Sequence, residues 1–284
     1  MKIDEQTRES TSLLFLKSSQ ADGFRLTPVG TAFYIGEQLG RGRAIKYIVT
    51  ARHVVDGSRP VGSLWIRCIH TNGKKFLFEL PTDSWWSHPH TDVAIAPLAI
   101  PLEDFGRRYI PLELFADTEW MTEHEVGIGD HVVAVGLFSQ FIGQERDAPI
   151  ARFGRISLIP NEPIRVPGNG GLPSMEFEAI LAELGSWNGQ SGSPVWAYFS
   201  IDRHLFAGQE LAAKIPNPRL LGVVHGHYNF PQTVQNFDAA KVNMNSGIAI
   251  IVPATKIFEV LGLDAALEYR EHFVRVLREE GLLD

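Results

Sequence analysis

The chain has 284 residues, enough for one large domain or two modest domains with a buried core. Its 26 Lys and Arg residues against 33 Asp and Glu residues give a formal net charge of −7, so it lacks the basic field that nucleic-acid binding requires. Its single cysteine, Cys68, excludes an intramolecular disulfide. This composition favours a peptide, a protein or a small molecule as partner and argues against a nucleic acid.

The first apolar run of the chain is short. It covers only residues 13–16 and follows early acidic residues, so it is too short for a secretory signal or a membrane span. We therefore expect this run to form the first strand, and the protein to be cytoplasmic and without a membrane partner.

Strand signals dominate the chain as far as Pro253, as short β-branched and aromatic runs separated by Gly, Pro or Asp. Residues 30–36 and 44–51 flank a polar segment and predict a hairpin. Residues 63–80 predict a second hairpin around Asn72-Gly73, a strong two-residue turn signal. Further strands are predicted at 92–98, 131–138, 150–159, 175–182, 193–199, 220–226 and 246–252.

The number of short strands decides the fold class. About a dozen of them without long intervening helices predict an all-β chain, built as antiparallel barrels or sandwiches. Loop-like, proline-bearing sequence between Tyr109 and Gly129 is the place where two β units could divide. After Pro253 the apolar spacing changes to a helical one, and Gly262 and Gly281 are plausible helix stops.

Three segments carry the residue types of nucleophilic catalysis, in the order His, Asp, Ser. His53 follows a buried-looking strand, Asp92 precedes a strand of small and branched residues, and Ser191 lies between two glycines. A serine hydroxyl needs a nearby base, and the base needs an orienting acid. Each segment alone is also typical of a turn or a structural histidine. Their common order in one all-β chain is what indicates a catalytic site.

These segments resemble the signature regions of trypsin-like serine peptidases of the chymotrypsin fold. The matching stretches are TARHVV (50–55), TDVAIAPL (91–98) and GQSGSPVW (189–196). Residues 220–226 and 246–252 resemble the strands beside the specificity pocket of that family, and 129–138 the opening strand of its second barrel. The resemblance covers most of the chain.

The resemblance is to a disulfide-free, bacterial-type member of the family. It implies two antiparallel six-stranded β-barrels with the active site between them, followed by C-terminal α-helices. The expected division is an N-terminal barrel at 1–118, a C-terminal barrel at 119–253 and a helical segment at 254–284.

By this resemblance His53 is the general base, Asp92 the acid that fixes its tautomer, and Ser191 the nucleophile. The backbone N–H groups of Gly189 and Ser191 would form the oxyanion hole, and a glycine at position 189 lets the peptide turn its N–H towards the developing oxyanion. The implied activity is that of a serine endopeptidase acting on a protein or peptide substrate without a cofactor. The alternative is an inactive module of the same fold that binds peptides or regulates.

Gln190 departs from the secreted digestive members of the family. Those members have an aspartate here, which pairs with a newly cut amino terminus and switches the enzyme on. The uncharged amide of Gln190 cannot make that pair, so this activation route is predicted to be absent. We expect control by a ligand or by a regulatory protein partner instead.

The side-chain preference of the pocket is left open by the sequence. By resemblance Gly185 and Ser186 lie near the pocket base, and His225, Gly226 and His227 replace the usual wall. The predicted base of the pocket contains no acidic residue, which argues against cleavage after Arg or Lys. Small or medium apolar side chains are the favoured substrates. Alternatively, Ser186 and one of the histidines bind an acidic side chain.

Two histidine pairs have a spacing that zinc can use, His88 with His90 and His225 with His227. The first pair adjoins the predicted catalytic acid, and the second lies on the predicted substrate strand. A His-Glu-x-x-His motif is missing from the sequence. We therefore expect no metal, and a metal-dependent hydrolase ranks last among the candidate functions.

Overall fold

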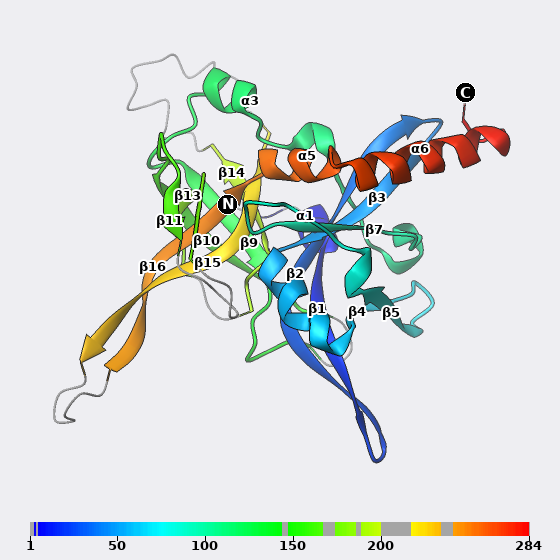
Figure 1. Ribbon diagram of the computed structural model, residues 1–284, viewed down its shortest axis with the longest axis horizontal. Coiled ribbons are helices and arrows are strands. Elements are labelled where there is room, and N and C mark those ends of the chain that lie inside the picture. The colour runs from blue at the N-terminus through cyan, green and yellow to red at the C-terminus, as the bar shows by residue number, and fades with distance from the viewer. Residues whose placement is uncertain are drawn as a thin grey trace.

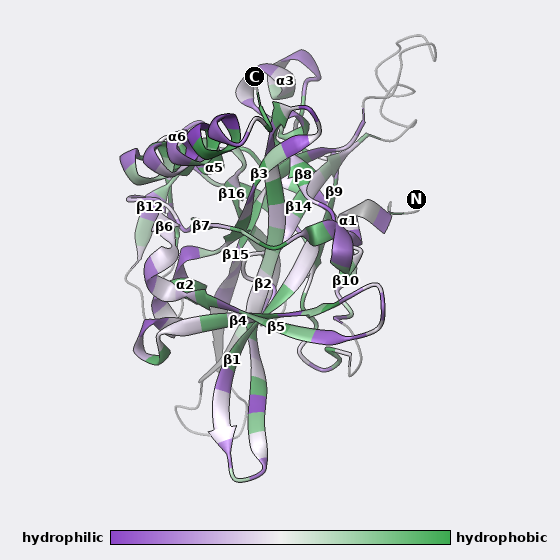
Figure 2. Cartoon of the chain, turned by 90° about the vertical axis from the view of Figure 1, so that its right-hand side faces the viewer, coloured by the Kyte–Doolittle hydropathy of each residue, from purple (hydrophilic) through white to green (hydrophobic). Residues whose placement is uncertain are grey.

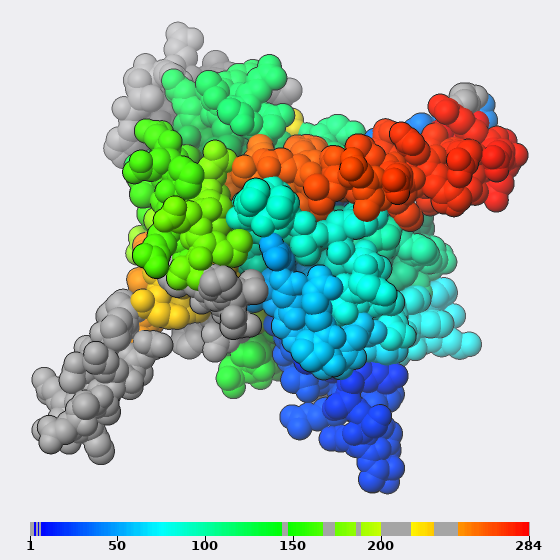
Figure 3. Space-filling model, viewed as in Figure 1, coloured from blue at the N-terminus to red at the C-terminus, as the bar shows by residue number. Residues whose placement is uncertain are grey.

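The computed structural model describes residues 3, 5–143, 147–166, 174–185, 189–199, 217–233 and 241–283. Figure 1 shows two β units lying next to each other, with the carboxyl-terminal helices along one side of them. In the space-filling view, α5 (Thr255–Leu261) and α6 (Asp264–Glu279) form a continuous ridge above the amino-terminal sheet (Figure 3). None of the described helices is long and apolar enough to cross a membrane.

The amino-terminal unit is an eight-stranded sheet. Its strands pair in the order β5-β4-β1-β2-β3-β7-β6, all antiparallel, while β8 pairs in parallel with β2. Their bounds are β1 Thr11–Gln20, β2 Gly23–Gly40, β3 Arg43–Thr50, β4 Ser63–Ile69, β5 Lys75–Pro81, β6 Trp86–Ser87, β7 Ala94–Pro97 and β8 Ile110–Pro111.

The second unit is a closed six-stranded barrel in the order β10-β13-β16-β15-β14-β9. Its bounds are β9 His131–Gly136, β10 Ile150–Leu158, β13 Ile180–Glu183, β14 Pro194–Tyr198, β15 Arg219–Thr233 and β16 Lys241–Pro253. A separate two-stranded sheet is formed by β11 Ile164–Val166 and β12 Met175–Phe177.

The predicted all-β class is confirmed, and so are the C-terminal helices. The amino-terminal sheet has eight strands where six were expected, because the two-residue strands β6 and β8 pair with β7 and β2. The hairpin predicted around Asn72-Gly73 joins β4 to β5, but its turn is longer than two residues: the strands pair as far as Ile69 and Lys75, and the Gly73 N–H donates to the His70 carbonyl at 2.8 Å. Gly73 has a positive φ of +85°. The domain boundaries at residues 118 and 253 stay predictions.

Shorter helices complete the fold. They are α1 Glu5–Glu9, α2 Arg52–Ser58 and α3 Thr118–Glu123. Figure 2 shows α6 as a mostly hydrophilic helix beside strands whose central parts are mostly hydrophobic. Tyr269 and Phe273 of α6 pack against the core, and Arg270 forms a bidentate ion pair with Glu37 of β2. These contacts dock the last helix on the two β units.

One apolar cluster joins the two β units. Phe33 and Val49 of the amino-terminal sheet belong to the same buried cluster as Trp196 and Val223 of the barrel. Two further clusters lie inside the sheet and inside the barrel. Because apolar burial contributes roughly 25 cal/mol per Å², the shared cluster holds the two units against each other. The candidate site lies where they meet.

Candidate active site

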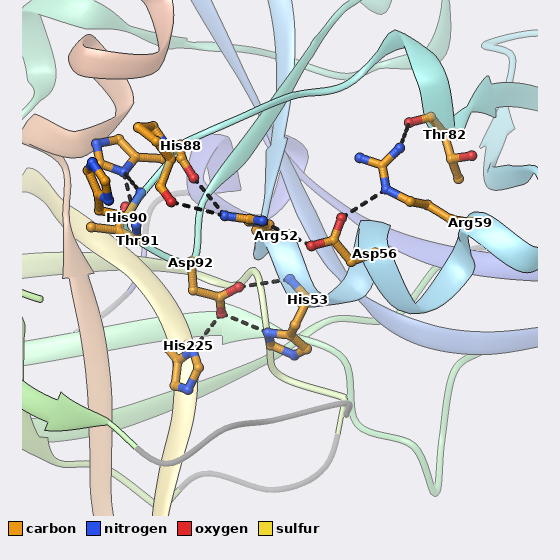
Figure 4. Close-up of polar contacts among 11 residues, drawn as sticks. Arg52, His53, Asp56, Arg59, Thr82, His88, His90, Thr91, Asp92 and His225 are labelled. Carbon is orange, nitrogen blue, oxygen red and sulfur yellow. Dashed lines mark hydrogen bonds and ion pairs between the residues drawn. The ribbon is translucent and has the colours of Figure 1, made fainter. Parts of the chain in front are cut away.

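Both β units contribute to the candidate site (Figure 4). The amino-terminal sheet supplies His53, at the start of α2 just after β3, and Asp92, just before β7. The barrel supplies Ser191, in the turn before β14, and His225 of β15. Residues far apart in the sequence are thus brought together at the boundary of the units.

His53 and Asp92 make a buried two-point contact. Asp92 Oδ2 lies 2.7 Å from Nδ1 of His53, and Asp92 Oδ1 accepts the backbone N–H of His53 at 2.8 Å. His53 is 8% exposed and Asp92 is fully buried. Because an ionised carboxylate only accepts hydrogen bonds, Nδ1 of His53 carries the proton. The neutral ring therefore has its lone pair at Nε2, the position that a general base needs.

The charge of Asp92 is strongly stabilised. Burial by itself raises the pKa of this carboxyl group, since it penalises the charged form, but hydrogen bonds from His225 and His53 lower it. The net result is a pKa of about 2, against the ordinary 3.8. Asp92 is consequently ionised at neutral and at mildly acidic pH.

His225 contacts two of the predicted catalytic residues. Its Nδ1 lies 2.5 Å from Asp92 Oδ2, and its backbone carbonyl accepts the Ser191 hydroxyl at 3.1 Å. The ring is 4% exposed. By resemblance His225 belongs to the pocket wall, and its contact with Asp92 was not predicted. A histidine inside the apolar stretch LLGVVHG is the signal that could have indicated a buried polar partner.

The turn that carries Ser191 depends on two glycines. Gly189 has a φ of +95° and Gly192 a φ of +86°, conformations that L side chains rarely adopt. A Cβ atom at Gly192 would overlap the carbonyl oxygen of Thr31 and Oγ1 of Thr50. The turn therefore lies directly against the amino-terminal sheet. The oxyanion role predicted for Gly189 and Ser191 stays a prediction.

Thr31 of β2 fastens this turn to the sheet. Its backbone N–H donates to the Ser191 carbonyl at 2.9 Å, and its hydroxyl donates to the Gly189 carbonyl at 3.1 Å. The same hydroxyl accepts the backbone N–H of Leu137 at 2.9 Å, and the Thr31 carbonyl accepts the Thr50 hydroxyl at 2.6 Å. Thr31 was not predicted as a site residue, because a threonine inside a strand is ordinary.

Asp147 provides a second anchor between the units. It follows β9 and its side chain is fully buried, with Oδ1 accepting from Nε and Nη2 of Arg67 on β4 at 3.1 and 2.9 Å. Its Oδ2 accepts the backbone N–H of Leu13 on β1 at 3.2 Å. The connection between β9 and β10 is thereby tied to the amino-terminal sheet.

The loop that carries Asp92 is braced by His88. Nδ1 of His88 accepts the backbone N–H groups of His90 and Thr91 at 3.1 and 2.9 Å. Its Nε2 lies 2.9 Å from Glu259 Oε2 of α5, so both ring nitrogens are in hydrogen bonds. The predicted pair His88 and His90 therefore holds a loop together in this structure.

His53, Asp92 and His225 are close enough to be considered as a metal site, with ligand atoms within 4.8 Å of one another. Tetrahedral zinc with bonds of about 2.05 Å would separate its ligand atoms by about 3.3 Å. The two contacts to Asp92 Oδ2, at 2.7 and 2.5 Å, are shorter than this. As they stand, His53 and His225 are each hydrogen-bonded to Asp92.

The predicted pocket residues are described only in part. Ser186 lies outside the described residues, and Gly185 lies exposed just after β13. A Cβ atom built on Gly185 would lie 3.5 Å from Nη1 of Arg152, on β10. His227 is half-buried, and burial lowers its pKa below the ordinary 6.5. The substrate-binding roles of Gly185, Gly226 and His227 stay predictions.

No family model matches this sequence, and no curated protein matches it. Among solved structures, the chain is similar to the crystal structure of the Rv3671c protease from M. tuberculosis in its active form, with 18% identity over 90% of this chain and 80% of that chain and a TM-score of 0.45. It is also similar to the inactive form of the Rv3671c protease, with 20% identity over 90% of this chain and 88% of that chain and a TM-score of 0.45.

Proposed function

We propose that the chain is a serine endopeptidase of the trypsin-like kind that cleaves peptide bonds through an acyl-enzyme. The observation that carries the proposal is the buried contact between His53 and Asp92, in which one carboxylate holds both the ring and the backbone of the histidine. This contact fixes the tautomer that a general base needs. Ser191 lies in a glycine-shaped turn, where its hydroxyl donates to the backbone carbonyl of His225, and it is the proposed nucleophile.

The proposed reaction begins with attack of Ser191 Oγ on the scissile carbonyl carbon, while His53 Nε2 takes the hydroxyl proton. For this the hydroxyl turns from the His225 carbonyl, to which it now donates, towards His53. The backbone N–H groups of Gly189 and Ser191 stabilise the oxyanion. His53 then protonates the leaving amine, and water repeats the sequence to release the acyl group.

The substrate side chain that we propose is acidic. The sequence favoured small or apolar side chains and kept an acidic one as the alternative. The alternative is supported by the Arg152 guanidinium, whose Nη1 would lie 3.5 Å from a Cβ atom built on Gly185, a predicted pocket residue. A partly buried guanidinium favours a carboxylate over an apolar group. Digestion of a peptide library tests this preference: cleavage after Glu or Asp in wild type, lost in Arg152→Met, is expected. Cleavage after apolar residues by both proteins would contradict it.

We further propose that a ligand or a regulatory protein partner controls the site. Gln190 is 1% exposed, and neither of its side-chain amide atoms has a hydrogen-bond partner among the described residues. An unsatisfied buried polar group costs roughly 1–3 kcal/mol, which favours a second arrangement of this turn. Constitutive, full-rate cleavage of unstructured peptides by the purified protein would contradict this control.

A catalytically inactive peptide-binding or regulatory module is the second candidate. The hydrogen bond from Ser191 to the His225 carbonyl is what favours it, because a hydroxyl held this way is not donated to a base. Both candidates use the same fold, and they differ in the reactivity of a single oxygen atom.

Labelling with a fluorophosphonate probe separates the two candidates. Wild-type protein is expected to be labelled at Ser191, and Ser191→Ala is expected to be unlabelled. Peptide turnover by Ser191→Ala should fall by on the order of a millionfold. The matched control is Ser18→Ala in the β1–β2 hairpin, which should label like wild type. Labelling that persists in Ser191→Ala, or none in wild type with added peptide ligands, would overturn the proposed activity.

A further inference from the structure

One carboxylate oxygen serves two imidazoles in this site. Asp92 Oδ2 lies 2.7 Å from Nδ1 of His53 and 2.5 Å from Nδ1 of His225 (Figure 4). The two rings stand nearly edge to face, with an interplanar angle of 73° and centroids 5.5 Å apart. A carboxylate oxygen has two lone pairs, so two donors can approach it from different sides.

The tautomers of both histidines follow from this contact. Asp92 is ionised and can only accept, so each Nδ1 must carry a proton. Each neutral ring then carries its lone pair at Nε2. His225 is therefore a donor to the acid, in the same way as His53.

The second donor also fixes how the carboxylate is turned. Asp92 Oδ1 is held by the backbone N–H of His53, while Oδ2 is held by the two rings. Without His225, the donors to the Asp92 carboxylate among the described residues would both belong to His53 of α2. Three donors from two β units leave it a single orientation, with Oδ2 aimed at the base.

The same residue reaches the nucleophile through its backbone. The carbonyl oxygen of His225 accepts the Ser191 hydroxyl at 3.1 Å. His225 thus links the acid of one β unit to the nucleophile of the other. Among the described residues, the charged and titratable groups that interact with its ring are Asp92, His53 and His227, and Phe177 packs at a ring distance of 6.0 Å.

We propose that His225 is a positioning residue of the catalytic site, which donates its Nδ1–H to Asp92 and so holds the acid in register with His53. This inference rests on the proposed peptidase function. In this role His225 is not a residue of the pocket wall. The residues proposed to recognise substrate on β15 are then Gly226 and His227.

The first test is the wild-type proton NMR spectrum with histidine nitrogens labelled with ¹⁵N. Two strongly downfield Nδ1–H resonances are expected, one lost in His225→Phe and both shifted in Asp92→Asn. This measurement needs no catalysis, so it stands even if the proposed activity fails. A single downfield resonance that persists in His225→Phe would overturn the inference.

The second test is the rate of fluorophosphonate labelling at Ser191. His225→Phe removes the donor and keeps a ring, and it should slow labelling by about tenfold to a hundredfold, because small misplacements of catalytic groups cost this much. His225→Asn keeps an N–H near the Nδ1 position and should recover most of the rate. His272→Phe and His272→Asn, on the exposed face of α6, are the matched controls.

Folded His225→Phe that labels at the wild-type rate would overturn the inference. Absence of labelling in wild type would instead count against the peptidase function alone.

Discussion

The two halves of the candidate site are held in different ways. His53 and Asp92, the proposed base and acid, lie on one β unit and bind each other through two hydrogen bonds, with Asp92 fully buried. Ser191, the proposed nucleophile, lies on the other unit, and its turn is held from outside, by Thr31 of the neighbouring sheet. His225 is the residue that touches both halves.

This difference indicates which perturbations each half can tolerate. The pair of His53 and Asp92 depends on its own charge and on burial, so it responds to pH and to substitution of the pair itself. The Ser191 turn depends on the fit between the units, so it responds to changes far from the serine. Stability and reactivity measurements can therefore separate the two halves.

The largest effect is expected for Asp147→Ala, which breaks the second anchor between the units. It leaves Arg67, only 12% exposed, without its carboxylate, and losing one partner of a buried ion pair costs about 3–5 kcal/mol. Urea unfolding measures this loss, and fluorophosphonate labelling of Ser191 should slow in parallel.

The matched control for Asp147→Ala is Glu103→Ala. Glu103 pairs with Lys46 while its own side chain is 71% exposed, so its removal should cost no more than about 1 kcal/mol. Equal losses of stability in the two variants would show that the buried ion pair of Asp147 stabilises the fold no more than the exposed pair of Glu103.

Gly192→Ala tests the fit of the Ser191 turn directly. The new Cβ would overlap the Thr31 carbonyl oxygen, so the turn must move away from the sheet. A displacement of about 1 Å should slow labelling at Ser191 by about a hundredfold. The downfield Nδ1–H resonance of His53 should persist, because the other half keeps its own hydrogen bonds.

Gly73→Ala is the control for backbone strain in that experiment. Its φ of +85° matches the +86° of Gly192, but nothing lies within 4 Å of the position of its Cβ. A slowing of labelling as large in Gly73→Ala as in Gly192→Ala would contradict the steric explanation.

The smallest effect concerns the acid itself and its pH dependence. The pKa of Asp92 is about 2 when folded and 3.8 ordinarily, so its carboxylate stabilises the folded state by about 2 kcal/mol. This contribution is fully present above about pH 4 and is lost as the pH falls through 2, because protonation removes the favoured charged form. Thermal unfolding measured between pH 4 and 2 checks it. Asp92→Asn should show a flatter dependence in this window, and parallel curves would contradict the assignment.

Much of the fold could be read from local patterns. The Asn72-Gly73 hairpin and the helices after Pro253 depend on residues near in sequence, and they are where they were predicted. The short strands β6 and β8 were missed, because two residues carry no periodicity. Their pairing is decided by neighbours far along the chain.

The site was predictable in its residue types but not in its contacts. The motifs around His53 and Asp92 are local, and the structure brings these two residues together. The roles of His225 and Thr31 depend on the packing of one β unit on the other. A strand sequence gives the direction of a side chain relative to its neighbours, but it does not reveal which carboxylate lies opposite across a boundary.

The close approach of Gly192 to Thr31 has a consequence for how such a protein can change over evolutionary time. The turn of one unit is shaped to a main-chain oxygen of the other, and no side chain at position 192 can compensate for a shifted partner. Recombination that exchanged one β unit for that of a distant relative would separate the two surfaces. The units are therefore expected to be inherited as a pair, with their substitutions correlated across the boundary.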